Sequence, residues 1–135
     1  MDLIELESVL KHWLSEHTEI ELAILFGSYA KGTATDHSDI DFAIKLSSRQ
    51  GIKAGDKLAY IQQLSILLSR DIDLIDLRSV GQPLLAQIIK YGKRLLGSDA
   101  DYAQLAINNI NSIQDFTPYI ERMLTERRKR WLVNG

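Results

Sequence analysis

The apolar positions along this chain follow two kinds of repeat, one typical of helices and one typical of strands. In residues 3–16 and 56–69 they recur every three or four positions, which predicts two amphipathic helices. In residues 21–26, 39–46 and 71–77 they form a short run or alternate with polar residues, which predicts three strands. The second helix is expected between the last two strands.

The same patterns predict which positions are buried. The segment 71–77, with the sequence DIDLIDL, is apolar enough to suggest a strand that is buried on both faces. The helix at 56–69 should turn one apolar stripe toward the core. That stripe is expected to contain Leu58, Ile61, Leu64, Leu67 and Leu68.

Helix signals continue in the second half of the chain. Pro83 suits a first helical turn, so a helix is expected to begin there. Ser98 or Asp99 is expected to cap a long helix, because short polar side chains accept hydrogen bonds from a first turn. Thr117 and Pro118 form an N-cap and first-turn pair that predicts a last helix.

Together these elements predict a small α/β (α+β) fold. We expect a small mixed sheet flanked by helices, with a helical C-terminal arm. Residues 1–97 should form the core, and residues 98–135 a helical extension that packs on the core, on a partner, or on both. The length of 135 residues suits a single domain overall.

Composition narrows the class of protein. The chain is 45% hydrophobic and 25% charged, with a net charge of −2, so it is neither a disordered chain nor a general polyanion binder. It has no cysteine, which excludes disulfides, thiolate chemistry and Cys-based zinc sites. No apolar run approaches the ~20 residues of a membrane span, and the acidic start MDLIELE is unlike a signal peptide. A cytoplasmic location is therefore expected.

Two aspartates stand one residue apart at the start of the second predicted strand. Asp39 and Asp41 should project from the same face, with Cα atoms roughly 6.5–7 Å apart. Paired carboxylates are unfavourable in a partly dry site unless one is protonated or a cation lies between them. Hard divalent cations with oxygen ligands, Mg²⁺ above all, are the natural partners when phosphates complete the coordination shell.

A glycine and a serine follow the first predicted strand. Gly27 lets the backbone approach a ligand closely, and Ser28 offers a hydroxyl. The backbone N–H groups of a helix start would follow, an arrangement that binds phosphate. Lys31 is a further candidate for contact with phosphate. The Walker A and Gly-x-Gly-x-x-Gly patterns are both absent from the sequence.

A third carboxylate is expected, because two-metal phosphoryl chemistry needs another oxygen ligand or a base. The strand at 71–77 offers Asp71, Asp73 and Asp76. We favour Asp73, because it lies among apolar residues where a carboxylate has little structural use. Asp71, at the beginning of the strand, is interpreted as a surface residue that pairs with Arg70.

These residues carry a resemblance to a known family. Gly27-Ser28, ten intervening residues and Asp39-Ile40-Asp41 resemble the signature of the DNA polymerase β-like nucleotidyltransferase superfamily. The chain length and DIDLIDL resemble the minimal nucleotidyltransferases (MNT). The segment DFTPYIERMLTERRKR resembles the C-terminal arm of MntA-like antitoxins from HEPN/MNT toxin–antitoxin modules. One departure is Tyr29, where many relatives carry a basic residue directly after Gly-Ser.

The resemblance implies a sheet of the nucleotidyltransferase type and transfer of AMP from ATP. The implied acceptor is a tyrosine hydroxyl on a HEPN ribonuclease toxin encoded by a neighbouring gene, which would form a hetero-oligomer with this chain. Asp39, Asp41 and Asp73 would act in catalysis and bind two Mg²⁺ ions. The phosphates of ATP would be held by Gly27, Ser28 and Lys31.

Two other functions stay open at this point. The chain could be a non-catalytic antitoxin that acts by stoichiometric binding. It could also be a small-molecule nucleotidyltransferase of the aminoglycoside type, although 135 residues leave little room for a second substrate domain. The basic run at 127–130 is either a solvated helix end or a docking arm, and direct nucleic-acid binding is not expected.

Overall fold

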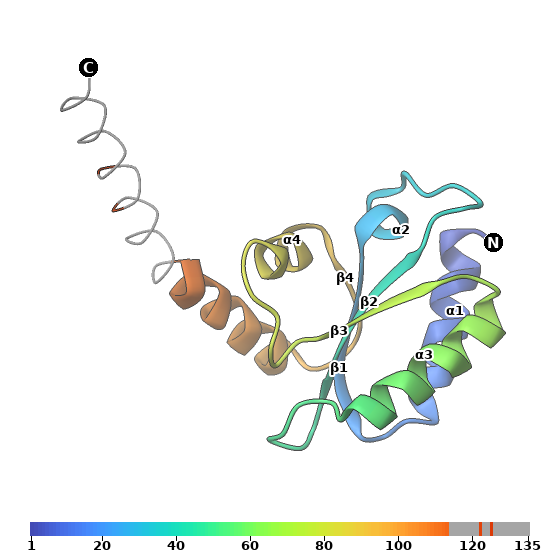
Figure 1. The fold of residues 1–135 in the computed structure, drawn as a ribbon, viewed down its shortest axis with the longest axis horizontal. Coiled ribbons are helices and arrows are strands. Elements are labelled where there is room, and N and C mark those ends of the chain that lie inside the picture. Colours follow the sequence, from blue (N-terminus) through green and yellow to red (C-terminus); the bar gives the residue numbers. More distant parts are fainter. Residues whose placement is uncertain (114–121, 123–124, 126–135) are drawn as a thin grey trace.

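The computed structural model describes residues 1–113, 122 and 125 (Figure 1). In this part of the chain, four strands form one mixed sheet of order β3-β2-β1-β4. The strands are β1 (Ile20–Phe26), β2 (Ile40–Leu46), β3 (Ile72–Asp76) and β4 (Lys93–Leu96). The helices are α1 (Leu3–Ser15), α2 (Gly27–Lys31), α3 (Ala54–Leu68) and α4 (Leu84–Tyr91), and residues 99–113 are also helical.

The pairing of the strands follows from the lengths of their connections. β1 runs antiparallel to both β2 and β4, whereas β2 and β3 are parallel. Parallel neighbours need a long crossover, and α3 supplies it between β2 and β3. The sequence pattern predicted three strands and missed β4. Its four residues show no clear alternation of apolar and polar side chains, so only pairing with β1 identifies them as a strand.

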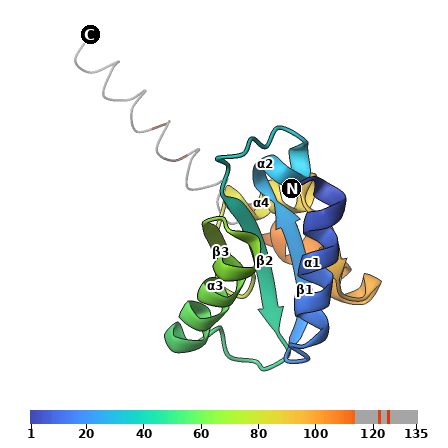
Figure 2. The ribbon, with the colours of Figure 1, turned by 90° about the vertical axis from the view of Figure 1, so that its right-hand side faces the viewer.

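Helices cover both faces of the sheet. Figures 1 and 2 show α1 and α3 on one face, with α4 and the helix at 99–113 on the other. The larger core lies under α1 and α3, where Trp13 and Phe42 pack edge to face with ring centroids 6.4 Å apart. The smaller core lies under α4 and includes Ile24, Ala43 and Ile88. This second face also carries Asp41, because strand residues alternate between faces.

The buried face of α3 differs from the stripe that the sequence predicted. Tyr60, Leu64 and Leu68 are buried, whereas Leu58 and Leu67 are 57% and 54% exposed. The buried residues are spaced four apart and so form one row along the helix. The expectation that Leu58 and Leu67 are buried was wrong, because an apolar-rich helix has more apolar positions than one packing face can hold.

β3 also differs from its prediction. The sequence suggested a strand buried on both faces, but β3 lies at the edge of the sheet and only Leu74 in it is buried. The segment before α3 contacts this edge strand, because the backbone N–H of Ile52 donates to Asp76 Oδ2 at 2.9 Å. Asp76 Oδ1 accepts from the backbone N–H of Arg78 at 2.9 Å, which makes Asp76 a structural residue at the end of the strand.

The helix that follows β4 is capped as expected. Ser98 Oγ accepts from the backbone N–H of Asp101 at 3.1 Å, which confirms Ser98 as the N-cap residue. Leu105 in this helix is buried in the smaller core. Of the last predicted helix, from Thr117 to about Leu132, only Arg122 and Thr125 are described, and both are helical. The division at residue 97 therefore stays a prediction.

No helix in the described part of the chain is both long and apolar enough to cross a membrane.

Two leucines of α3 test which face of the helix is buried. We expect Leu64→Ala to lower the free energy of unfolding by about 2–5 kcal/mol, because the side chain is fully buried in the larger core. Leu67→Ala is the matched control, and a loss below about 1 kcal/mol is expected for it. Urea unfolding measures both. Equal losses would contradict the observed face of the helix.

Candidate active site

The end of β1 brings a glycine directly against an aspartate. Gly27 has φ +72°, a backbone conformation that residues with a side chain rarely adopt. A Cβ placed on it would overlap Asp41 Oδ2 and lie 2.7 Å from Asp41 Cγ. Phe26 and Asp41 are paired residues of β1 and β2, which explains the close approach. Gly27 therefore provides the space in which the Asp41 carboxylate lies.

Two of the predicted carboxylates are neighbours across the sheet. In the parallel register of β2 and β3, Asp41 is paired with Asp73. Burial raises the pKa of Asp41 from 3.8 to about 6, with further contributions from the charge of Asp73, a hydrogen bond with Asp73 and the charge of Asp39. The first cause is desolvation and the others are the effects expected of crowded carboxylates. This end of the sheet is thus rich in negative charge.

The reason that Asp73 lies beside Asp41 differs from the reason that the sequence suggested. The prediction selected Asp73 because its neighbours are apolar, and that reasoning assumed a buried strand. In the structure Asp73 is exposed, because β3 is an edge strand. Its place beside Asp41 comes from the strand register, not from depth.

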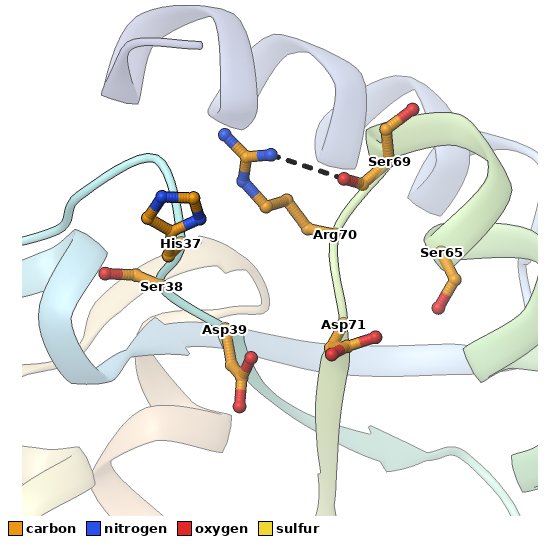
Figure 3. Close-up of a pocket in the computed structure, with 7 residues that line it drawn as sticks. All are labelled: His37, Ser38, Asp39, Ser65, Ser69, Arg70 and Asp71. Carbon is orange, nitrogen blue, oxygen red and sulfur yellow. Dashed lines mark hydrogen bonds between the residues drawn. The ribbon is translucent and has the colours of Figure 1, made fainter.

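Asp39 lies just before β2 and is exposed. Its side chain lines a cavity together with Asp71, which the sequence analysis interpreted as a surface residue (Figure 3). The backbone carbonyl of Asp71 accepts a hydrogen bond from the N–H of Ile40 at 2.9 Å, which joins the start of β3 to the start of β2. Asp39 therefore stands between the Asp41–Asp73 pair and this cavity.

The donor set suits a hard divalent cation. Two carboxylates that raise one another's energy are stabilised when a cation binds between them, and Mg²⁺ favours carboxylate oxygens. Among the described residues, no group of three His, Asp or Glu side chains is already gathered around one point. Asp41 and Asp73 are thus two neighbouring candidate ligands, and phosphate oxygens would have to complete the shell of a cation bound there.

The segment after Gly27 forms the short helix that the sequence predicted. Ser28 is half-buried, and its carbonyl accepts from the N–H of Thr33 at 2.9 Å. Tyr29, where many relatives carry a basic residue, is buried in the larger core. Lys31 Nζ lies 4.7 Å from the centre of the Tyr91 ring, in a cation–π contact. The structure thus places Lys31 beside α4, next to an exposed aromatic ring.

Sequence reasoning treated Arg70 only as a partner for Asp71. Within the described residues, no ion pair joins Arg70 to a carboxylate, and its Nε is buried without a hydrogen-bond partner. Arg70 lines the same cavity as Asp39. Its position directly before the acidic strand was the one sequence signal that could have marked it.

Comparisons with known proteins identify the family of this chain. The family model of polymerase beta nucleotidyltransferases matches residues 8–101. Protein adenylyltransferase MntA of Shewanella oneidensis is 38% identical over 96 residues, which cover 71% of this chain and 68% of MntA. The chain therefore belongs to the polymerase beta nucleotidyltransferase family. Its sequence and fold place it among the MntA-like minimal nucleotidyltransferases.

Two solved structures show the same fold. A crystal structure of a toxin–antitoxin with AMP-PNP is similar with a TM-score of 0.72 and 30% identity, covering 80% of this chain and 86% of that chain. A mutant MntA toxin–antitoxin structure has a TM-score of 0.75 and 27% identity, covering 88% of this chain and 94% of that chain. The mixed sheet with flanking helices predicted from the sequence is confirmed.

Alanine substitutions at two glycines distinguish the cost of backbone strain from the cost of a steric clash. Gly27 and Gly32 both have positive φ, but nothing lies within 4 Å of a Cβ placed on Gly32. We expect Gly32→Ala to lose about 1–2 kcal/mol of stability from backbone strain alone. Gly27→Ala should lose more, and it should also shift the Asp41 carboxyl resonance in NMR spectra. Equal losses with an unmoved Asp41 would contradict the close approach.

The raised pKa of Asp41 predicts how stability depends on pH. Between about pH 4 and 6 the folded chain holds more protons on Asp41 than the unfolded chain does, so its contribution to stability falls as pH rises. Asp41→Asn should therefore be more stable than the unmodified chain at pH 7, and their difference should shrink toward pH 4. Urea unfolding across this range measures it.

The control for this measurement is Asp56→Asn, which changes an exposed carboxylate in the first turn of α3. Its pH dependence should run parallel to that of the unmodified chain. A destabilised Asp41→Asn at pH 7 would contradict the crowding of the carboxylates.

Proposed function

We propose that this chain is an antitoxin that transfers AMP from ATP to a tyrosine hydroxyl of a HEPN ribonuclease toxin and so neutralises it. The observation that carries the proposal is the register that sets Asp41 beside Asp73 next to the Gly27 turn. The similarity to MntA, which is a protein adenylyltransferase, supports AMP as the transferred group. A related toxin–antitoxin structure contains AMP-PNP, which supports ATP as the donor.

The reaction joins the acceptor oxygen to the α-phosphorus of ATP and breaks the bond from that phosphorus to the bridging oxygen, so pyrophosphate leaves. Ser28 and the turn at Gly27 would hold the phosphates, with Lys31 as a further contact. Asp39, Asp41 and Asp73 would hold two Mg²⁺ ions. When bound, Mg²⁺ supplies charge stabilisation at the attacking and leaving oxygens.

Asp73 is the carboxylate best placed to meet the acceptor. It is exposed on the edge strand, so a hydroxyl on another protein can reach it. Its carboxylate would orient that hydroxyl and accept its proton. Tyrosine and aspartate differ by about 6 units in reference pKa, or roughly 8 kcal/mol, so Asp73 alone is too weak a base. Stabilisation of the acceptor oxygen, as its negative charge forms, must provide the rest of this free energy.

The proposed partner is the toxin of the same module. Related structures are toxin–antitoxin assemblies, which supports a hetero-oligomer. The HEPN class of that toxin follows from the family resemblance. Neutralisation by binding alone is the competing function, and it predicts that the carboxylates are dispensable.

The test mixes the purified chain, the toxin from the neighbouring gene, ATP and Mg²⁺, and follows the intact mass of the toxin. An AMP adduct is expected, together with loss of RNA cleavage. Asp41→Asn and Asp73→Asn should each slow adduct formation by at least about a hundredfold. Excess EDTA should abolish adduct formation, because the proposed reaction uses Mg²⁺.

Asp56→Asn is the control and should transfer AMP at the unmodified rate, since it lies in the first turn of α3. Neutralisation that persists without an adduct, or in both site variants, would establish stoichiometric binding instead.

A further inference from the structure

A second cavity lies at the opposite end of the sheet from the aspartates. It has a volume of about 490 Å³ and lies between the end of β2, the residues after β3 and the helix at 99–113. Lys45 of β2 projects to the same face as Asp41, but four residues along the strand, or roughly 13 Å. Ala43 between them is fully buried in the smaller core. The cavity therefore shares a face with the candidate active site but is separate from it.

Three cations and, among the described residues, no carboxylate line this cavity. The cations are Lys45, Arg49 in the loop after β2, and Arg78 after β3. The chain as a whole has a net charge of −2, so this concentration of positive charge is local. The side chains of Lys45 and Arg78 are only 21% and 25% exposed, and partial removal of water strengthens their attraction for an anion.

Two carboxylates outside the lining balance part of this charge. Glu21 Oε1 lies 3.0 Å from Lys45 Nζ and 3.8 Å from Arg78 Nη2. Asp76 lies behind Gly51, which also lines the cavity, and its two oxygens already accept backbone N–H groups. Three cations against two carboxylates leave an excess of one positive charge. The cavity therefore suits an anionic group.

The two arginines have donors available for that group. Arg49 is exposed and forms no ion pair in the described part of the chain. Nη2 of Arg78 donates to the backbone carbonyl of Leu46 at 2.9 Å, which fixes the guanidinium beside the cavity. Guanidinium groups bind phosphate through two parallel hydrogen bonds, and a group that is already fixed loses less conformational freedom on binding.

The helix at 99–113 adds an amide pair to the cavity. Gln104 Nε2 donates to Asn108 Oδ1 at 3.0 Å, and both side chains line the cavity. The Gln104 carbonyl oxygen and the Asn108 amide nitrogen have no other partner among the described residues. One acceptor beside one donor matches the polar edge of a nucleobase. Leu77 and Leu105 also line the cavity and supply apolar contact for a base or a ribose.

We propose that this cavity binds a nucleoside monophosphate. Its phosphate would lie on Lys45, Arg49 and Arg78, and its base on the amides of Gln104 and Asn108. The volume is in the range of pockets for one small ligand. The site is separate from the proposed ATP site and does not rest on the proposed function. Two sources share this chemistry: a free nucleotide and the 5′-phosphorylated end of an RNA chain.

Equilibrium dialysis of the full chain against radiolabelled AMP in EDTA tests binding without catalysis. We expect saturation with one AMP per chain. We also expect AMP to bind at least about tenfold more tightly than inorganic phosphate, because the base adds contacts that phosphate lacks. Equal affinities for AMP and phosphate, or no binding at millimolar AMP, would overturn the nucleotide site.

Two side chains of the loop after β2 test the role of charge. Arg49→Gln should weaken AMP binding by about tenfold, because it removes a charged hydrogen-bond donor, and Arg49→Lys should keep part of the affinity. Lys53→Gln changes an exposed lysine at the end of the same loop and is the matched control, so its affinity should not change. Urea unfolding should show equal stability for all three variants. An unchanged affinity in Arg49→Gln, or an equal loss in Lys53→Gln, would overturn the site.

Glu21→Gln should change the affinity in the opposite direction. The Glu21 carboxylate competes with the ligand for Lys45 and Arg78. Its neutralisation should therefore tighten AMP binding by about twofold to fivefold, which is the usual range for one partly exposed ion pair. An unchanged or weaker affinity would contradict the placement of the phosphate on these cations.

Two further measurements separate this site from the candidate active site and identify the source of the ligand. Asp41→Asn should bind AMP in EDTA as the unmodified chain does, and a loss of binding would place AMP at the aspartates and overturn a separate site. A 5′-phosphorylated tetranucleotide that binds at least about tenfold more tightly than AMP would identify an RNA end as the ligand. Tighter binding of AMP would identify a free nucleotide.

Discussion

The crowding of carboxylates at one end of the sheet is the constraint on which the rest of the structure depends. Parallel pairing of β2 and β3 sets Asp41 beside Asp73, and the absent side chain of Gly27 gives Asp41 its space. Burial and neighbouring charge raise the pKa of Asp41, so this arrangement is unfavourable in the isolated chain. Such destabilised groups are typical of functional sites.

The two cores hold this unfavourable arrangement in place. The larger core under α1 and α3 fixes the inward face of β2 through fully buried residues such as Phe42 and Ile44. Alternation along the strand then directs Asp41 to the opposite face. There the smaller core covers Ala43, which follows Asp41 by two residues, and leaves the end of the strand open to ligands. Packing at one end of the strand therefore compensates for repulsion at the other.

The edge position of β3 leaves part of the site exposed. A central strand would bury its side chains on both faces, whereas Asp73 and Asp71 at the edge are exposed. The same edge carries the cavity with Arg70. The proposed transfer of AMP to another protein needs such an open approach to the carboxylates, and this sheet order provides it.

The sequence by itself determined the local elements and the chemistry that they carry. Its periodicities predicted the main helices and three of the four strands, and the spacing of Gly27, Asp39 and Asp41 indicated the family. Local patterns suffice for this, because helix and strand periods are properties of neighbouring residues. Local patterns could not show β4. Its four residues do not alternate between apolar and polar side chains, and only their pairing with β1 identifies them as a strand.

Tertiary structure alone decided which carboxylates meet and which groups stay unpaired. Asp73 lies beside Asp41 because of strand register, although the sequence favoured it for a burial that it does not have. Tyr29 is buried in the core and Lys31 lies over Tyr91, while Arg70 lines the cavity beside Asp39. Register, edge position and side-chain partners arise between segments far apart in the chain, so no local pattern encodes them.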